Sequence, residues 1–219
     1  QGCCGSCLTT DSSIKLRNSE MSSDTLAAAC RHLCRVDPTM EQLIRKVGEC
    51  QLRPRGARYS LLVRAILSQQ ISVKAARTIH TRLQRLLPGR YISARRMSTL
   101  SDRQLRAVGI SSQKRRYLRH LTDLTLDGTL NFRSLAATSD DETIVAAVTQ
   151  VAGIGRWTAQ MFLLFGLGRL DVFAADDLGL RNAIALRYKL PIAPTSDDYH
   201  AVSQRWIPFR SIASWYLWR

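Results

Sequence analysis

The chain has 219 residues, of which 45% are hydrophobic, so it can bury a sizeable core and is neither a disordered nor a fibrous protein. Its longest apolar runs, such as 161–167, are far shorter than the roughly 20 residues of a membrane-spanning helix, so a soluble protein is expected. The net charge is +15, and residues 41–120 carry nearly all of it, with 19 Lys or Arg against three acidic residues. A basic field of this size attracts polyanions by releasing their counterions. Nucleic acid is therefore the leading partner, and an arginine-rich solvated surface is the alternative.

The first residues, 1–23, contain no basic stretch followed by an apolar one, as a signal or transit peptide would. An intracellular location is expected, in the cytoplasm with the nucleoid if the protein is bacterial, and this polar segment is expected to be disordered. All six cysteines lie within the first 50 residues. Buried or free thiols of a reducing compartment are the expected state, and a zinc site of Cys4, Cys7, Cys30 and Cys34 is the alternative.

The remainder of the chain has Ser, Thr or Asp at expected helix starts, Gly or Pro at helix ends, and no sustained apolar–polar alternation, which predicts an all-α fold. In the first half, helices are predicted over residues 24–34 and 37–47, along a face of Leu62, Ala65, Ile66 and Gln69, from a cap at Ser72 to Pro88-Gly89, from a capping box at Ser101-x-x-Gln104 to Gly109, and over Ser112–Leu126.

In the second half, a capping box at Ser139-x-x-Glu142 is predicted to open a helix that continues to Val151. A glycine turn at residues 152–155 then leads into a helix from Arg156 to about Gly166. Later helices are predicted to start at Asp176-Asp177, at Thr195 or Ser196, and after Pro208.

The turn Gly153-Ile154-Gly155 joins two of these helices into a compact hairpin. Its glycines leave backbone N–H groups uncovered next to a positive helix N-terminus, which suits a phosphate. On its own, so short a pattern is as typical of a plain tight connection. The context favours the phosphate site, because the run GIGRWTA at residues 153–159 is followed by two aspartates, the second of them 20 residues after Trp157.

With these residues the sequence resembles the helix-hairpin-helix (HhH-GPD) DNA glycosylase superfamily, and within it the 3-methyladenine DNA glycosylase II (AlkA) type, over about residues 37–219. The matching stretches are LVRAILSQQISVKAA at 62–76, the hairpin through residue 181, and RWIPFRS at 205–211. The resemblance implies a core over 24–219, with two interleaved helical subdomains flanking a DNA-binding cleft and the hairpin at about 140–167. The family's additional N-terminal β-sheet layer is not expected here, because the 36 or so residues before the match are too few to form it.

The resemblance also implies that Asp177 is the catalytic carboxylate and that its neighbour Asp176 is not. Breaking an N-glycosidic bond builds positive charge on the sugar, and a carboxylate can stabilise that charge or activate water. Without the hairpin, an ordinary helix cap would be the better interpretation of Asp177. Related enzymes that also nick the strand carry a lysine in place of Trp157, because a Schiff base needs an amine. We therefore expect a monofunctional glycosylase that hydrolyses alkylated bases of the 3-methyladenine and 7-methylguanine class from duplex DNA.

A base inside a duplex reaches such a carboxylate only after it is flipped out of the stack. The resemblance implies that Trp157 and Trp218 form aromatic walls for a cationic alkylated purine, with Met161 where the family often has tyrosine. Core packing is the alternative for each tryptophan. Gln70, with Gln69 beside it, would fill the gap left in the duplex, and solvated turn amides are the alternative there.

Backbone carbonyls of Thr149, Val151 and Ile154 would, by resemblance, hold a structural Na⁺ or K⁺ that bridges to a DNA phosphate. Gly153, Gly155 and Thr158 would meet the same phosphate. Further phosphate candidates are Lys74, Lys114, Arg115 and Arg116. No cofactor is expected for the chemistry, and no iron–sulfur cluster is expected, since no cysteine follows Cys50.

The partner is thus expected to be double-stranded DNA with damaged bases, bound by a monomer that is not associated with a membrane. Two other functions remain open from the sequence. One is a glycosylase of the same fold for oxidised or mismatched bases, and the other is a helix-hairpin-helix DNA-binding module without activity.

Overall fold

The computed structural model describes residues 21–54 and 56–219, and this part of the chain is built of helices with no strand, as the all-α prediction required. The predicted disordered segment and Cys3, Cys4 and Cys7 lie outside the described residues, except that residues 21–23 are described and Ser23 begins a helix. Cys30, Cys34 and Cys50 are free thiols. Among the described residues, no helix combines the length and apolarity that a membrane span requires.

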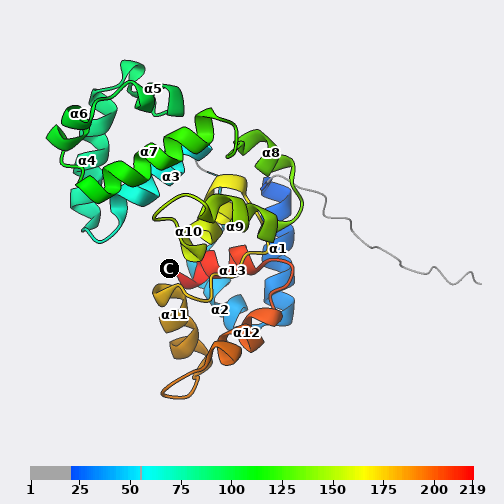
Figure 1. The fold of residues 1–219 in the computed structure, drawn as a ribbon. Helices are drawn as coiled ribbons and strands as arrows, with labels where there is room; N and C mark the ends of the chain where they lie inside the picture. The colour runs from blue at the N-terminus through cyan, green and yellow to red at the C-terminus, as the bar shows by residue number, and fades with distance from the viewer. Residues whose placement is uncertain (1–20, 55) are drawn as a thin grey trace, which may run out of the picture.

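The helices form two lobes, each around its own hydrophobic core (Figure 1). The middle lobe takes the middle of the chain and contains α3 (Arg58–Ser68), α4 (Val73–Arg85), η1 (Pro88–Arg90), α5 (Ala94–Ser98), α6 (Asp102–Ala107), α7 (Ser112–Leu126), α8 (Phe132–Ala137), α9 (Asp141–Thr149) and α10 (Arg156–Phe162). The terminal lobe unites the two ends of the described chain and contains α1 (Ser23–Val36), α2 (Pro38–Val47), α11 (Leu178–Tyr188), α12 (Ser196–Gln204) and α13 (Arg210–Leu217).

A π-helical turn, η2 (Leu163–Leu167), joins α10 to the terminal lobe. Its Leu163 belongs to the core of the middle lobe and the adjacent Leu164 to the core of the terminal lobe. The two lobes are therefore connected through buried side chains of one short segment.

Helix α3 lies at the centre of the middle lobe, where it packs against α4, α7 and α10. Helix α13 has the matching position in the terminal lobe, where it packs against α1, α2 and α11 and buries every residue from Ser211 to Leu217. Because α13 is so enclosed, the residue that follows it, Trp218, has a fixed position.

Several helix boundaries agree with the sequence-based predictions. Helix α7 spans the predicted Ser112–Leu126, Ser72 caps α4, and the reciprocal capping box of Ser101 and Gln104 is present. The predicted box at Ser139-x-x-Glu142 is wrong.

Asp140 caps α9 instead, because its carboxylate accepts hydrogen bonds from the Glu142 and Thr143 amides. The Glu142 side chain does not reach back to the cap, since it pairs with Arg156 at 2.8 Å.

Other boundaries differ in detail. Helix α3 ends at Ser68, so Gln69 is its C-cap and not part of its buried face. Helix α4 ends at Arg85, ahead of Pro88-Gly89, where the short η1 follows. The five-residue α5 and the six-residue α8 were not predicted, because elements this short show too few turns for a hydrophobic period.

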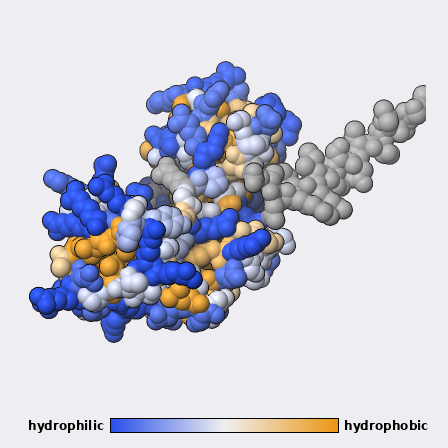
Figure 2. All heavy atoms as spheres, turned by 90° about the horizontal axis from the view of Figure 1, so that it is seen from above, coloured by the Kyte–Doolittle hydropathy of each residue, from blue (hydrophilic) through white to orange (hydrophobic). Residues whose placement is uncertain are grey.

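Most of the surface in Figure 2 is hydrophilic, with scattered apolar patches. The exposed large apolar side chains include Val73, beside the turn between α3 and α4, and Leu178, the first residue of α11. Isolated apolar residues are normal on protein surfaces. Each of these two adjoins a residue that the sequence predicted to act on DNA, Lys74 and Asp177 respectively.

Candidate active site

Asp177 is the N-cap of α11, directly after an irregular segment that ends in a turn. Its Oδ1 accepts a hydrogen bond from the Leu180 amide at 2.7 Å, which satisfies one of the free amides at the helix start. The side chain is half-buried. The local sequence thus accounts for the position of the carboxylate, and the rest of its surroundings come from distant segments.

Two tryptophans donate hydrogen bonds to this carboxylate. The Trp157 indole Nε1 donates to Asp177 Oδ2 at 2.9 Å, and the Trp218 indole Nε1 donates to Oδ1 at 3.0 Å. The three groups of the described residues that bind the two oxygens, both indoles and the Leu180 amide, are therefore all N–H donors. Three residues that the sequence selected separately are brought together at one point.

The two indoles differ in accessibility. Trp157 lies in the first turn of α10 and is 46% exposed, whereas Trp218 is half-buried and stacks on Phe165 with ring centroids 5.9 Å apart. Met161 follows Trp157 by one helical turn and is also half-buried. Trp157 is therefore the more accessible of the two indoles that bind the carboxylate.

Gly179 allows this close packing. A Cβ at this position would lie 3.3 Å from Asp177 Oδ1 and 3.7 Å from Trp218 Cδ1. An alanine there would crowd the carboxylate oxygen, while its contact with the indole would be an ordinary van der Waals one. The run Asp177-Leu178-Gly179 is thus fitted to the site.

Asp37 is also a helix cap that accepts a hydrogen bond from an indole, but it is closed to solvent. It caps α2, and its Oδ2 accepts hydrogen bonds from the Tyr188 hydroxyl at 2.7 Å and the Trp206 indole at 2.9 Å. Asp37 is only 1% exposed, so it ties three segments of the terminal lobe together and cannot meet a ligand. Burial together with Asp37 raises the pKa of Tyr188. A cap with an indole donor is therefore not by itself catalytic, and Asp177 differs because it is only half-buried and one of its indole donors, Trp157, is exposed.

The hairpin consists of α9, the glycine turn and α10. Gly153 has φ +82°, and a Cβ there would lie 2.2 Å from the Tyr117 ring, so both the backbone and the neighbouring ring require glycine. Gly155 is the N-cap of α10 without a side-chain cap and has open space around it. The Ala152 amide is held by Nδ1 of His120 at 3.0 Å. Thr158 is 8% exposed and so offers little surface to a ligand.

The three carbonyls predicted to hold a cation lie in this turn. No described residue donates a hydrogen bond to the carbonyls of Thr149 and Ile154, and the Val151 carbonyl accepts one from the Ile154 amide at 3.0 Å. Each carbonyl oxygen therefore has a lone pair available, which fits the oxygen donors that a hard monovalent cation needs.

Gln69 and Gln70, which were predicted to act together, have different surroundings in the turn between α3 and α4. The Gln69 amide donates to the Gly153 carbonyl at 2.6 Å, so this side chain braces the hairpin. Gln70 is exposed and has φ +54°. Lys114 holds the turn in place, because its ammonium donates hydrogen bonds to the carbonyls of Leu67 and Gln69 at 2.8 Å each. Burial lowers the pKa of Lys114.

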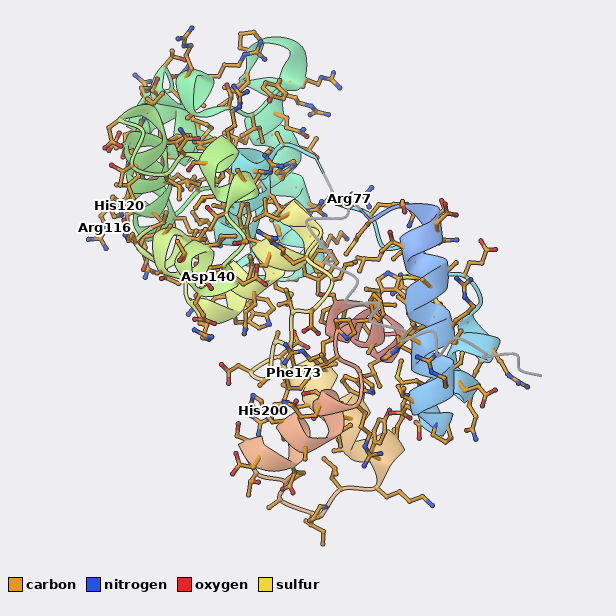
Figure 3. The ribbon with its side chains drawn as sticks, turned by 90° about the vertical axis from the view of Figure 1, so that its right-hand side faces the viewer. Arg77, Arg116, His120, Asp140, Phe173 and His200 are labelled. Atoms are coloured by element: carbon orange, nitrogen blue, oxygen red, sulfur yellow. The ribbon has the colours of Figure 1, made fainter. Side chains whose placement is uncertain are left out.

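The four basic phosphate candidates fall into two groups. Lys114 is bound to the turn, and Arg115 is bound to Asp102 at 2.8 Å and to the Ile110 carbonyl at 2.8 Å. Lys74 and Arg116 are exposed. Figure 3 shows Arg116 on the middle lobe near His120, the residue that holds the Ala152 amide. Sequence reasoning missed His120, Gln113 and Tyr117, because nothing in the pattern of α7 marks the side chains that reach the hairpin.

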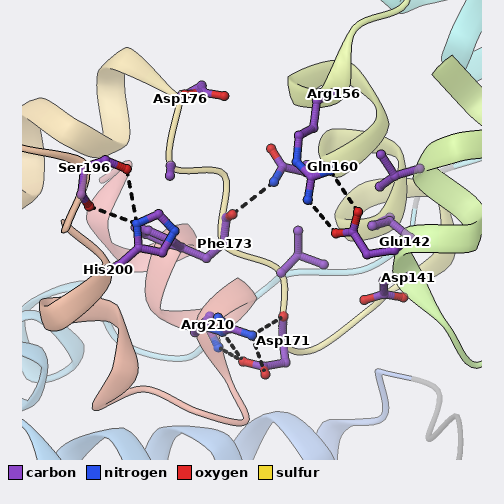
Figure 4. A pocket seen from close by; sticks show the side chains of 14 residues that line it. Asp141, Glu142, Arg156, Gln160, Asp171, Phe173, Asp176, Ser196, His200 and Arg210 are labelled. Atoms are coloured by element: carbon purple, nitrogen blue, oxygen red, sulfur yellow. Dashed lines mark hydrogen bonds and ion pairs between the residues drawn. The ribbon is translucent and has the colours of Figure 1, made fainter.

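A separate hollow of about 440 Å³ lies between the lobes and is lined by Asp176, not by Asp177 (Figure 4). Its charges are largely paired within the protein, since Arg156 binds Glu142 and Arg210 binds Asp171 at 2.8 Å. The Gln160 amide donates to the Phe173 carbonyl across the hollow at 3.2 Å. Asp176 is exposed at its edge. The two adjacent aspartates thus face different surroundings.

Residues 63–208 match the model of the HhH-GPD superfamily base excision DNA repair proteins. The DNA-3-methyladenine glycosylase 1 of Schizosaccharomyces pombe is 33% identical over 201 residues, which cover 89% of this chain and 87% of that protein.

Two solved structures are similar in fold as well as in sequence. The DNA-3-methyladenine glycosidase of Bacillus halodurans is 32% identical, with a TM-score of 0.78 and 87% of each chain covered. The S. pombe 3-methyladenine DNA glycosylase Mag1, in complex with abasic DNA, is 33% identical, with a TM-score of 0.75 over 87% of this chain and 95% of that one.

Proposed function

The chain belongs to the HhH-GPD superfamily of base excision DNA repair proteins, and from this membership we propose that it is a monofunctional DNA glycosylase. It hydrolyses the N-glycosidic bond of alkylated bases, of the 3-methyladenine and 7-methylguanine class, in duplex DNA. Support for this substrate class comes from relatives named as 3-methyladenine glycosylases that are about a third identical over most of both chains. The proposal places the protein inside the cell, with the genomic DNA.

The observation that carries the proposal is the half-buried Asp177 carboxylate, which accepts hydrogen bonds from two indole N–H donors, one of them on the exposed Trp157. As the bond to the base breaks, the sugar becomes oxocarbenium-like, and the fixed negative charge of Asp177 stabilises it. The donors hold the carboxylate in one orientation, so little reorganisation is needed during the reaction. Water then adds to the sugar, and the free base and an abasic site are released.

Trp157, Met161 and Trp218 receive the flipped base. An alkylated purine with positive charge stacks favourably on an indole face, and Trp157 offers such a face next to the carboxylate. Met161 is polarizable and flexible but donates no hydrogen bond, which favours tolerance of differently alkylated purines.

Gln70 fills the space that the flipped nucleotide leaves, since it is the exposed amide of the turn. Gln69 supports it through the hairpin. Gly153, Gly155 and Thr158 bring the hairpin backbone to a phosphate, and carbonyls of Thr149, Val151 and Ile154 hold a structural Na⁺ or K⁺ there. This cation supplies only charge bridging to the phosphate. The protein acts as a monomer and needs no cofactor for the chemistry.

The decisive experiment is release of free bases from methylated duplex DNA by the wild type, by Asp177→Asn and by the matched control Asp176→Asn. Loss of the catalytic charge should lower the rate by at least about a hundredfold, whereas the neighbouring substitution should leave it close to wild type. Equal release by the wild type and Asp177→Asn would show that another group performs the reaction.

A second measurement tests the monofunctional mechanism. Treatment of the reacting mixture with borohydride should trap no covalent enzyme–DNA adduct, because Trp157 provides no amine for a Schiff base. Efficient trapping would mean that a lysine elsewhere attacks the sugar.

A further inference from the structure

The outer end of the middle lobe carries positive charge that the protein does not balance. Residues 81–110, which run from the end of α4 through η1, α5 and α6, contain seven arginines and one acidic residue. Six of these arginines are exposed and have no hydrogen-bonded or ion-paired partner among the described residues. We call them the arginine surface: Arg82, Arg85, Arg90, Arg95, Arg103 and Arg106.

We propose that the arginine surface binds the backbone of a second segment of duplex DNA while the site of Asp177 holds the first. The inference rests on the DNA binding that belongs to the proposed function. A protein that holds two segments at once can pass from one to the other without first dissociating into solvent, which shortens the search for rare damaged bases.

The elements of the arginine surface are held together as one body. Arg96 of α5 donates a hydrogen bond to the Pro88 carbonyl of η1. A Cβ at Gly109, just after α6, would lie 3.6 Å from Ile79 of α4, and both residues line a hollow of about 420 Å³ together with Arg82. The six charges are therefore presented by one packed end of the lobe and not by separate loops.

The lack of carboxylates distinguishes this end from other parts of the protein. Asp102 is already bound by Arg115 of α7 at 2.8 Å. Elsewhere in the described chain, salt bridges join Arg45 to Glu41, Arg156 to Glu142, Arg169 to Asp141 and Arg210 to Asp171. Unbalanced like charges repel one another, and a bound polyanion would relieve that repulsion. The two parallel donors of a guanidinium group match the oxygens of a phosphate.

Helix α7 lies between the arginine surface and the hairpin. Its Tyr117 ring packs against Gly153 of the hairpin. Arg115, two residues earlier, binds Asp102 at the start of α6, and Arg119, two residues later, donates to a backbone carbonyl of α5 at 3.4 Å. Two residues correspond to about 200° around an α-helix, so both arginines leave α7 on nearly the opposite side from Tyr117.

This arrangement favours a second duplex over the flank of the first. A helix with its side chains is about 10–12 Å across, and DNA is stiff over about 150 base pairs, so a duplex held at the hairpin does not wrap around α7. Figure 1 shows α5 and α6 at the end of the middle lobe that lies away from α11, the helix that Asp177 caps. The arginine surface therefore remains open when the site is occupied.

The test removes charge from the arginine surface and leaves the site of Asp177 intact. The surface variant carries Arg82→Gln, Arg85→Gln, Arg103→Gln and Arg106→Gln. The control variant removes four exposed charges elsewhere in the described chain, by Arg31→Gln, Lys46→Gln, Arg133→Gln and Arg187→Gln. Because the two variants have the same net charge, a difference between them reports the position of the charges. Melting temperatures will verify that both are folded.

The main measurement is the capture of a second duplex. A short immobilised duplex with a reduced abasic site is saturated with protein, and binding of a free fluorescent duplex without damage is then followed. Wild type and control should capture the free duplex, and the surface variant should capture it at least about tenfold more weakly. Loss of four phosphate contacts should also reduce the slope of log affinity against log salt concentration by about 3–4. Single-turnover excision of an alkylated purine from a short duplex should be the same for all three proteins.

Equal capture by the surface variant and the control would overturn the inference. Weaker binding of one long duplex by the surface variant, with capture of the second duplex unchanged, would also overturn it, because the arginines would then contact the flank of the same DNA. Excision by the wild type without any capture refutes the arginine surface alone. Capture by the wild type without release of bases from methylated DNA refutes the proposed catalytic function and leaves the arginine surface in place.

Discussion

Gly153→Ala should destabilise the hairpin strongly, and the structure allows the size of the effect to be worked out. The φ of +82° costs a residue with a Cβ about 1–2 kcal/mol. The new Cβ would also lie 2.2 Å from the Tyr117 ring, and overpacking of this kind costs about 1–3 kcal/mol. Together these terms predict a loss of about 2–5 kcal/mol in the free energy of unfolding, or roughly 4–20 °C in the melting temperature for a chain of this length.

Urea unfolding of four variants separates the two causes. Gly155→Ala is the matched control, because its backbone is extended and no atom lies within 4 Å of a Cβ there, so its stability should stay close to wild type. In a Tyr117→Ala background, Gly153→Ala should cost only the backbone part, since the clash is gone. Equal costs for Gly153→Ala and Gly155→Ala, or the same cost with and without the Tyr117 ring, would refute this reasoning.

Three further predictions concern the carboxylates. Trp218→Phe keeps an aromatic ring but removes one donor to Asp177, so single-turnover excision should slow about tenfold at unchanged DNA affinity, and equal weakening of binding would contradict this. Asp37→Ala leaves two buried donors and the start of α2 without an acceptor, so chemical denaturation should show a loss of about 3–5 kcal/mol. Hydrogen bonds from the Thr143 side chain and amide hold the pKa of Asp140 below its usual value of 3.8. This cap therefore stabilises the fold above pH 3.8, and the stabilisation is lost as the pH falls through the lowered pKa. Asp140→Ala should therefore lower the melting temperature at pH 7 but not in strong acid. Ser139→Ala, the control, should leave the melting temperature unchanged at both pH values.

The sequence was most informative where a local signal coincided with the observed contact. The Ser101 capping box and the helix Ser112–Leu126 are set by neighbouring residues, and both were predicted correctly. At Ser139, the pattern alone was misleading, because Asp140 is an equally good cap and the expected Glu142 partner is taken by Arg156, 14 residues away. Competition of that kind depends on the tertiary fold.

The candidate site was likewise only partly predictable from the sequence. The sequence selected Asp177, Trp157 and Trp218, and the resemblance suggested walls for a base, but the hydrogen bonds from both indoles to the carboxylate emerge only when three distant segments meet. Likewise, Gln69 and Gln70 are adjacent and chemically identical in the sequence. Only the fold assigns one to the Gly153 carbonyl and leaves the other exposed. The role of each residue in binding DNA remains a prediction.

The interleaving of the lobes bears on how the protein matures on the ribosome. All helices of the middle lobe are contiguous in the chain, so this lobe can assemble while translation continues. Helices α1 and α2 must wait for α13, their packing partner, which follows the whole middle lobe in the chain and immediately precedes Trp218. We expect a stalled nascent chain that ends before residue 205 to protect its middle helices from protease while it leaves α1 and α2 open to cleavage. Repair activity would then begin only once α13 and Trp218 have been made, so that a chain without them could not excise bases.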